Sequence, residues 1–247
     1  MNRNKLLAPV IFCVALVSNS VNAIELPQTE NVPGGIMVVP LTQGSTKSTA
    51  TPRVKFRGQR VMVIYDNNRW QAVLGLSLKL KPGEYFLDTV DDGQDHRYAI
   101  ELVDKKYPVQ RLTIKNKRKV GPGKKDLEKI AKDRKKIGAA FITWSDKAQP
   151  PLRFDLPVKG YFSSQFGLVR YYNNSPRPRR HSALDIAAPT GTPVYAPADA
   201  IVVSIGEYFF TGGTVFLDHG QGLLTTYNHL SKIDVTPGMK IGRGQKI

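Results

Sequence analysis

Residues 176–230 read PRPRRHSALDIAAPTGTPVYAPADAIVVSIGEYFFTGGTVFLDHGQGLLTTYNHL. Short apolar runs alternate here with glycine and proline turns, which predicts short strands and no sustained helix. His181 and Asp185 are spaced H-x-x-x-D, and His229 follows far downstream in Tyr-Asn-His-Leu. An imidazole nitrogen and a carboxylate oxygen that lie close together suit zinc, whose bonds to such ligands are about 2.0–2.2 Å long.

The residues around this spacing are more informative than the spacing itself, because short motifs arise by chance. Together with the residues around them, His181, Asp185 and His229 form a pattern that resembles the lysostaphin-type (LytM-like) zinc metallopeptidases, which cut peptide cross-links of bacterial cell walls. The resemblance covers about residues 157–247, with Ala183 where the family usually has glycine. The residues that match the family pattern are His181, Asp185 through Val194, Asp218-His219-Gly220, Gly222, Thr225, Tyr227 and His229-Leu230.

The resemblance implies a role for each candidate. His181 and Asp185 would be two zinc ligands, and His229 would be catalytic, as a general base or as a stabiliser of the transition state. Taken alone, Asp185 could cap a turn, His181 could simply be exposed, and His229 could be a buried, hydrogen-bonded histidine. The matched residues around them favour the functional roles. His219 is predicted to be structural.

A catalytic zinc site needs three protein ligands and one open position. The family's third ligand and its second catalytic histidine lie in a later His-x-His motif, and this sequence reaches Ile247 without one. The resemblance therefore leads us to expect a peptidase domain that is truncated at its C-terminus. The 247-residue chain as it stands is expected to bind zinc weakly and to be inactive.

Three functions compete at this point. The first is a periplasmic zinc metalloendopeptidase that hydrolyses peptide cross-links of peptidoglycan, with the peptidoglycan peptide stems as its partners. The second is a non-catalytic LytM-like regulator that binds and activates a cell-wall amidase; degenerate relatives usually lose the ligands, so the presence of His181, Asp185 and His229 favours the enzyme. The third is a basic module that binds anionic envelope polymers or a membrane surface, which explains the charge but not the motif.

The first 23 residues predict a cleaved secretory signal peptide. Arg3 and Lys5 precede the apolar run from Leu6 to Val17, and Val21-Asn22-Ala23 is a suitable cleavage site. The apolar run is short for a membrane span, which needs about 20 residues. Cys13, the single cysteine, would be removed with the signal. We therefore expect a periplasmic or secreted protein.

The formal net charge of the chain is +16. A field of this size attracts polyanions, and an export signal points to envelope polymers or lipid phosphates and away from nucleic acid. Residues 104–136 concentrate the charge, with 14 Lys and Arg against 4 Asp and Glu. This run is more simply a solvated connecting segment than a docking patch for cell wall or membrane. The sequence does not indicate the oligomeric state.

The rest of the chain predicts a mainly β protein. Residues 24–115 are expected to form an N-terminal accessory domain resembling a small β-sandwich, because short strands alternate with turns, one of them at Asp66-Asn67-Asn68. A strand is predicted from Trp70 to Leu80, where leucine alternates with other residues. His96 lies between Asp95 and Arg97 and is expected to be an exposed turn residue.

Residues 116–150 are predicted to be a basic linker with a helix from Lys125 to Phe141. Its apolar residues share one face, and its charges suit the helix dipole, with acids at the start and bases near the end. Residues 151–247 are predicted to be an antiparallel β peptidase domain of the LytM-like type, incomplete at its end. A tight hairpin turn is expected at Gly212-Gly213. The residues of the helix face are Leu127, Ile130, Ile137 and Phe141.

Overall fold

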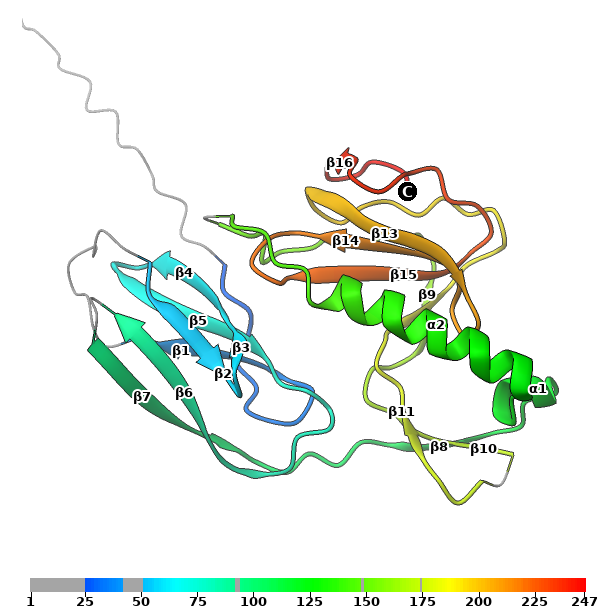
Figure 1. Cartoon of the computed structure of the whole chain (residues 1–247), viewed down its shortest axis with the longest axis horizontal. Coiled ribbons are helices and arrows are strands. Elements are labelled where there is room, and N and C mark those ends of the chain that lie inside the picture. Colours follow the sequence, from blue (N-terminus) through cyan, green and yellow to red (C-terminus); the bar gives the residue numbers. More distant parts are fainter. Residues whose placement is uncertain (1–24, 42–50, 92–93, 148, 174) are drawn as a thin grey trace, which may run out of the picture.

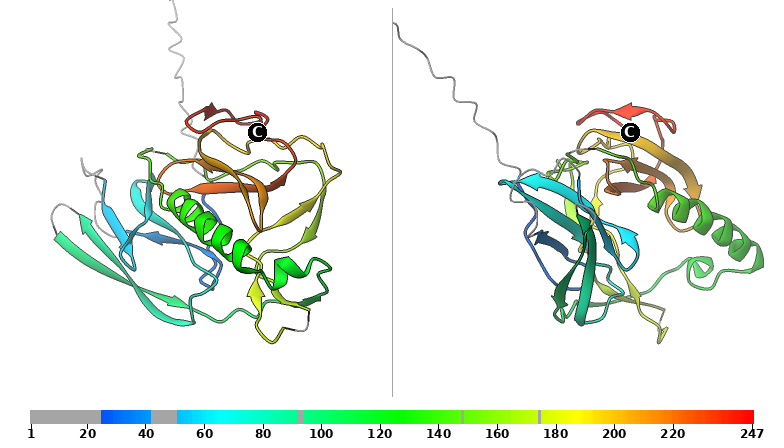
Figure 2. Two further views of the ribbon diagram at one scale, coloured as in Figure 1. Left: turned by 45° about the vertical axis from the view of Figure 1, so that its right-hand side comes forward. Right: turned by 60° about the vertical axis from the view of Figure 1, so that its left-hand side comes forward.

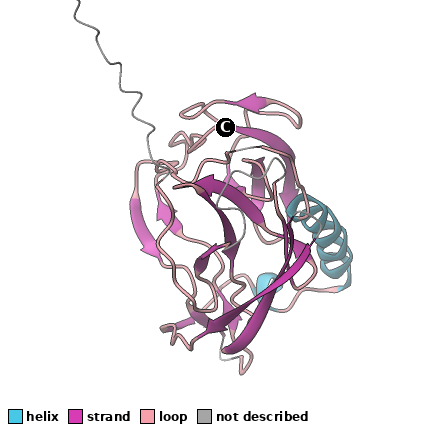
Figure 3. Cartoon of the chain, turned by 90° about the vertical axis from the view of Figure 1, so that its left-hand side faces the viewer, coloured by secondary structure: helices cyan, strands magenta, loops and turns pink. Residues whose placement is uncertain are grey.

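The structure is a computed structural model that describes residues 25–41, 51–91, 94–147, 149–173 and 175–247. The predicted signal peptide, with Cys13, lies outside these residues. The described chain is mainly β, as predicted, with antiparallel sheets and two helices (Figure 3). Within the same residues, no helix is long and apolar enough to cross a membrane.

Two antiparallel sheets build the N-terminal domain (Figure 1). One has the order β1 (Ile36–Pro40), β5 (Arg69–Gly75), β4 (Met62–Asp66), and the other has the order β3 (Gln59–Arg60), β2 (Arg53–Phe56), β6 (Gly83–Asp91), β7 (Gln94–Leu102). One apolar cluster joins them and includes Val39, Ala72 and Leu74 from the first sheet and Val54, Leu87, Ile100 and Leu102 from the second. The predicted sandwich is therefore confirmed.

Two local predictions in this domain need correction. The strand that begins at Arg69 ends at Gly75, not at Leu80, and a turn closed by the hydrogen bond from the Leu80 amide to the Ser77 carbonyl follows it. His96 lies within β7, opposite Thr89, because the β6–β7 ladder continues past it to Gln94. The turn after β4 is confirmed, with Asn67 and Asn68 at φ 49° and 60°, the left-handed conformation that such tight hairpins require.

A four-stranded antiparallel sheet forms the centre of the C-terminal domain. Its order is β15 (Leu224–Leu230), β14 (Gly212–Asp218), β13 (Ala200–Tyr208), β16 (Lys240–Ile241). Side chains of β14 alternate between its two faces, as strand geometry dictates. Val215 and Leu217 join the core on one face, whereas Phe216 joins the cluster formed with the long helix on the other.

The long helix, α2 (Lys124–Phe141), confirms the prediction within one residue. It lies across one face of this sheet (Figures 1 and 2), where Ile137 and Ala140 pack near Phe216. Leu127 and Phe141, which we predicted on the packed face, are 54% and 57% exposed. The basic residues Arg134 to Lys136 lie near the end of the helix, as predicted, but they precede the last turn, which contains no basic residue.

The predicted turn at Gly212-Gly213 is also wrong. Both glycines belong to β14, and the connection from β13 is made by residues 209–211. Gly213 has a packing role instead, because a Cβ atom there would lie 2.3 Å from the carbonyl oxygen of Leu230 on β15. Tight turns and close approaches between two strands both favour glycine, so the sequence alone does not distinguish them.

Two smaller sheets complete the C-terminal domain. One pairs β9 (Tyr161–Ser164) with β12 (Asp185–Ala187). The other has the order β11 (Arg179–Arg180), β10 (Val169–Tyr172), β8 (Val109–Leu112), with β8 and β10 parallel. After β7 the chain crosses to this sheet and then enters the short helix α1 (Lys117–Val120) before α2 (Figure 1).

The two domains are in direct contact. Met62, Ile64 and Val73 of the N-terminal sandwich pack with Leu152 and Leu223 of the C-terminal half. Trp144, which follows α2, lies beneath the guanidinium of Arg60 at 4.0 Å and against the Gly222 backbone. The linker thus connects two surfaces that already touch.

Candidate active site

The structure brings His181 and Asp185 together. His181 Nε2 lies 3.1 Å from Asp185 Oδ1. Backbone hydrogen bonds to Leu168 and from Gly167 continue the β10–β11 pairing through His181. Asp185 begins β12, beside Ser164 of β9. Two short sheets therefore position the two candidate ligands.

The second ring nitrogen of His181 has a defined partner. Nδ1 lies 2.8 Å from the carbonyl oxygen of Gln165, and the side chain is only 10% exposed. Because a carbonyl can only accept, Nδ1 carries the proton. Nε2 then faces an oxygen of Asp185, an arrangement that requires a proton or a cation between the two atoms. Metal-bound histidines typically have this kind of support on the far nitrogen.

Arg170 holds the other oxygen of Asp185. Its Nη2 lies 3.1 Å from Asp185 Oδ2 and 2.6 Å from Ser164 Oγ, and its Nε donates to Gln110 Oε1 at 2.9 Å. The Arg170 side chain is 13% exposed. Oδ1 of Asp185 is thereby left to face His181. Sequence analysis did not single out Arg170 or Gln165, and Gln110 comes from the distant strand β8.

The geometry of the pair fits two positions of a zinc site. Two ligands that share a tetrahedral zinc lie about 3.3–3.5 Å apart, given bonds of about 2.0–2.2 Å. The observed 3.1 Å is close to this separation. Over the residues that the structure describes, however, no group of three or more His, Cys, Asp and Glu side chains is positioned to hold a metal ion. Among the described residues, His181 and Asp185 thus match two of the three ligands that a catalytic zinc site needs.

His229 lies near the end of β15 in an unusual backbone conformation. Its φ is 60°, its side chain is exposed, and its amide donates to the Thr211 carbonyl at 2.8 Å. Residues other than glycine seldom adopt positive φ, and such positions are found more often at functional sites. Within the described residues, no hydrogen bond or ion pair links its side chain to His181 or Asp185. Its catalytic role stays a prediction.

His219 is structural in this fold, as predicted. It is buried, its Nδ1 donates to the Asp199 carbonyl at 3.0 Å, and its Nε2 lies 2.8 Å from Thr225 Oγ1. Tyr227 Oη in turn donates to Thr225 Oγ1 at 2.9 Å. Burial lowers the pKa of His219 and raises that of Tyr227 to about 12. Thr225 and Tyr227, the matched T-x-Y residues, therefore form a partly buried hydrogen-bond network with His219.

Comparison with a solved structure decides the family. The described fold superposes on the crystal structure of a protein assigned to peptidase M23 from Pseudomonas aeruginosa with a TM-score of 0.71. The two are 35% identical, and the match covers 89% of this chain and 82% of the other. The chain belongs to peptidase family M23. Models of the M23 peptidase and M23 N-terminal domains match residues 179–247 and 29–105.

Curated relatives of this M23 chain match over shorter stretches. The peptidoglycan DD-endopeptidase ShyA of Vibrio cholerae is 39% identical over 95 residues, which is 38% of this chain and 22% of that protein. The cell division protein DipM of Caulobacter vibrioides is 31% identical over 96 residues, or 38% of this chain and 15% of that protein. The matched stretch is thus less than a quarter of either relative.

Proposed function

We propose that this M23 chain belongs to a zinc-dependent endopeptidase that hydrolyses peptide cross-links of peptidoglycan. The observation that supports it most directly is the His181–Asp185 pair, in which Gln165 sets the histidine tautomer and Arg170 occupies the second carboxylate oxygen. Relatives named as peptidoglycan DD-endopeptidases support the choice of substrate. Peptidoglycan lies outside the cytoplasm, which agrees with the proposed signal peptide at residues 1–23 and with a periplasmic or secreted protein.

Each candidate residue would have its own role in peptide hydrolysis. His181 and Asp185 would hold the zinc ion, which when bound acidifies a water molecule to a pKa of about 7 and polarises the scissile carbonyl. His229 would accept a proton or donate a hydrogen bond to developing negative charge, the two roles open to an exposed imidazole. Arg170 would fix the direction of the Asp185 carboxylate.

The test combines metal binding with hydrolysis. Zinc affinity is measured by competition with a chromophoric chelator, and hydrolysis is measured on purified peptidoglycan, both with the full-length protein. We expect His181→Ala and Asp185→Ala to abolish both. Asp155→Asn is the matched control, because Asp155 pairs with Arg243 on an exposed surface. Zinc binding that is unaffected by either alanine variant would overturn the proposed ligand pair.

The same assays separate the competing functions. A regulator of a cell-wall amidase would bind peptidoglycan or the amidase without releasing cross-linked peptides itself. A basic polymer-binding module would bind anionic polymers without zinc, with an affinity that falls steeply as salt rises. Release of free amino groups from peptidoglycan, dependent on His181 and His229, is the outcome expected of the endopeptidase.

A further inference from the structure

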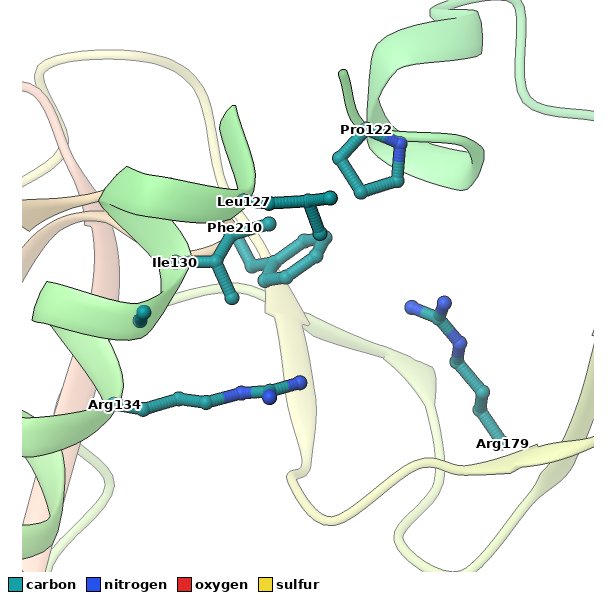
Figure 4. A pocket seen from close by; sticks show the side chains of 7 residues that line it. Pro122, Leu127, Ile130, Arg134, Arg179 and Phe210 are labelled. Carbon is teal, nitrogen blue, oxygen red and sulfur yellow. The ribbon is translucent and has the colours of Figure 1, made fainter. Parts of the chain in front are cut away.

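A cavity of about 500 Å³ lies outside the His181–Asp185 pair, between the first half of α2 and the connection that follows β13. Figure 4 shows Arg134 from α2 and Arg179 from β11 pointing toward the same open space from opposite sides. Their positions make this cavity the strongest candidate for an additional binding site. Its other lining residues include Pro122, Leu127, Ile130 and Phe210.

Both guanidinium groups face the cavity without a carboxylate partner. Among the residues that the structure describes, the Arg134 side chain makes no hydrogen bond or ion pair, and that of Arg179 has only the Phe210 ring, at 6.0 Å. The lining contains no acidic residue. Two of the acids on α2 are bound elsewhere: Asp126 to Arg118, and Asp133 to Lys129 and to the Phe209 amide. Two positive charges are therefore available to an anionic ligand.

The rest of the lining is apolar. Leu127 and Phe210 are 54% and 41% exposed, and Ile130 is buried behind them. A guanidinium group presents paired N–H donors that match the two oxygens of a carboxylate. Small-molecule pockets commonly measure about 300–1,000 Å³, so a short peptide segment fits this one. The lining thus suits a ligand that carries a carboxylate next to a small aliphatic group.

The cavity adjoins both parts of the candidate active site along the chain. Arg179 is paired with Arg170, and the same ladder continues to His181. Side chains two residues apart on a strand share a face, so Arg179 lies on the face that carries His181. On the other side, Phe210 precedes Thr211, whose carbonyl accepts the His229 amide. A peptide held near His181 and His229 would have this cavity within reach.

We infer that the cavity is a subsite for a carboxylate-bearing segment of the peptide substrate. Arg134 and Arg179 bind the carboxylate, and Leu127, Ile130 and Phe210 contact a small aliphatic side chain beside it. The inference rests on the proposed function only in assigning this carboxylate to the peptide that is hydrolysed. A neutral apolar ligand would cover two guanidinium groups without compensating them, which is costly.

The test uses two synthetic probes that differ in charge. The acidic probe is N-acetyl-Ala-Glu-Ala-Ala with a free C-terminus, and the neutral probe is N-acetyl-Ala-Gln-Ala-Ala amide. Binding of each to the full chain is measured by NMR titration without zinc. We expect the acidic probe to bind at least about tenfold more tightly, and Arg134→Gln and Arg179→Gln each to lower its affinity about tenfold, as befits a charge-assisted hydrogen bond.

Matched controls separate a pocket from general attraction by a basic surface. Lys135→Gln and Arg177→Gln remove the same charge from residues next to Arg134 and near Arg179 that do not line the cavity, and we expect unchanged binding. Ala131 lines the cavity on the exposed side of α2. Ala131→Phe fills the space while keeping every charge, and we expect it to abolish binding. Thermal melting of each variant verifies folding.

Each outcome of these binding measurements supports or contradicts one part of the inference. Equal losses in Lys135→Gln and Arg134→Gln, or normal binding by Ala131→Phe, would overturn the subsite and leave only surface attraction. Equal affinity for the two probes would overturn the carboxylate assignment. Because binding is measured without zinc, the subsite can stand even where no hydrolysis is found. Conversely, hydrolysis dependent on His181 would survive a negative result here.

Discussion

Arg170 and Asp185 form an ion pair of 3.1 Å whose arginine also holds Ser164 and Gln110. One guanidinium group therefore connects β12, which carries the candidate ligand, with β9 and with β8. Gln110 lies on the segment that leaves the N-terminal sandwich. The direction of the Asp185 carboxylate thus depends on contacts from β8, β9 and β10, of which β8 is distant in sequence.

This ion pair predicts that Arg170 affects zinc affinity by fixing the direction of the Asp185 carboxylate. Arg170→Gln is expected to weaken zinc binding about tenfold or more, the usual range for a residue that orients a ligand. Arg170→Lys keeps the charge but not the planar guanidinium group with its paired N–H donors, so this variant should lose nearly as much zinc affinity. Chelator competition measures both, with the exposed Arg97→Gln as control. A rise in affinity in Arg170→Gln would instead show that charge repulsion between the guanidinium and the metal dominates.

The buried His219 predicts a pH dependence of stability. Its pKa is lowered from the ordinary value of 6.5, chiefly because burial disfavours the charged ring. The unfolded chain therefore binds more protons than the folded chain below about pH 6.5, and stability rises with pH in that range. The contribution is complete above pH 6.5 and is lost as the pH falls from there through the folded-state pKa.

Thermal melting between pH 7.5 and 5 checks this directly, the range being roughly that of histidine titration. His219→Gln can keep one hydrogen bond to the Asp199 carbonyl and accept another from Thr225, but it does not titrate. We expect it to be less stable at pH 7.5 and to show a shallower decline toward low pH. A parallel decline in the variant would mean that other groups carry the acid sensitivity.

Gly167 is predicted to be intolerant of any side chain. Its φ is 88°, and a Cβ atom there would lie 2.1 Å from the Tyr107 ring. Its amide also donates to the His181 carbonyl at 2.7 Å. Gly167→Ala should therefore cost about 2–4 kcal/mol through backbone strain and overlap. Urea unfolding measures the loss, and Gly242→Ala is the control, because a Cβ atom at Gly242 meets nothing within 4 Å.

Gly167→Ala should also weaken zinc binding, because the hydrogen bond to the His181 backbone and the position of the neighbouring Gln165 carbonyl depend on this turn. Tyr107→Phe provides a milder comparison. It removes only the hydrogen bond from Tyr107 Oη to the Pro33 carbonyl and should cost about 1 kcal/mol without affecting zinc. Equal zinc affinity in all three proteins would disconnect this turn from the metal pair.

Local patterns identified much of the fold. The Asp-Asn-Asn turn, the sandwich and the helix up to Phe141 follow from signals a few residues apart. The parallel pairing of β8 with β10 could not be found this way, because its partners are 60 residues apart and α2 lies between them in the chain. The exposure of Leu127 has the same origin: periodicity identifies an apolar face but not how far the partner sheet extends beneath it.

The candidate site, like the fold, could be predicted only in part from the sequence. Family resemblance pointed to His181 and Asp185, and the structure brings these two within 3.1 Å. The family resemblance did not indicate Arg170 or the Gln165 carbonyl, because one arginine among many and a backbone oxygen leave no recognisable pattern in the sequence. The same holds for Arg179. Its role in binding follows only from its position beside the cavity that Arg134, from another element, also lines.

Gln221 is predicted to stabilise the contact between the two domains. β4 is an edge strand, and the Val63 amide on its outer side donates to Gln221 Oε1 at 2.9 Å. Gln221 Nε2 donates to the Lys147 carbonyl at 2.7 Å, so the amide plane is fixed. Gln221→Ala leaves the Val63 amide unpaired within a largely buried contact, which typically costs about 1–3 kcal/mol.

Gln221→Glu tests the direction of these bonds. A carboxylate can still accept from Val63 but can only repel the Lys147 carbonyl, because it has no donor when ionised. We expect both variants to lower the free energy of unfolding in urea. Gln59→Ala, at an exposed position of β3, is the control and should change little. If Gln221→Ala were as stable as that control, the bond between Gln221 and Val63 would contribute nothing, and the other contacts, such as the apolar packing around Leu223 and the Arg60–Trp144 pair, would hold the domains together.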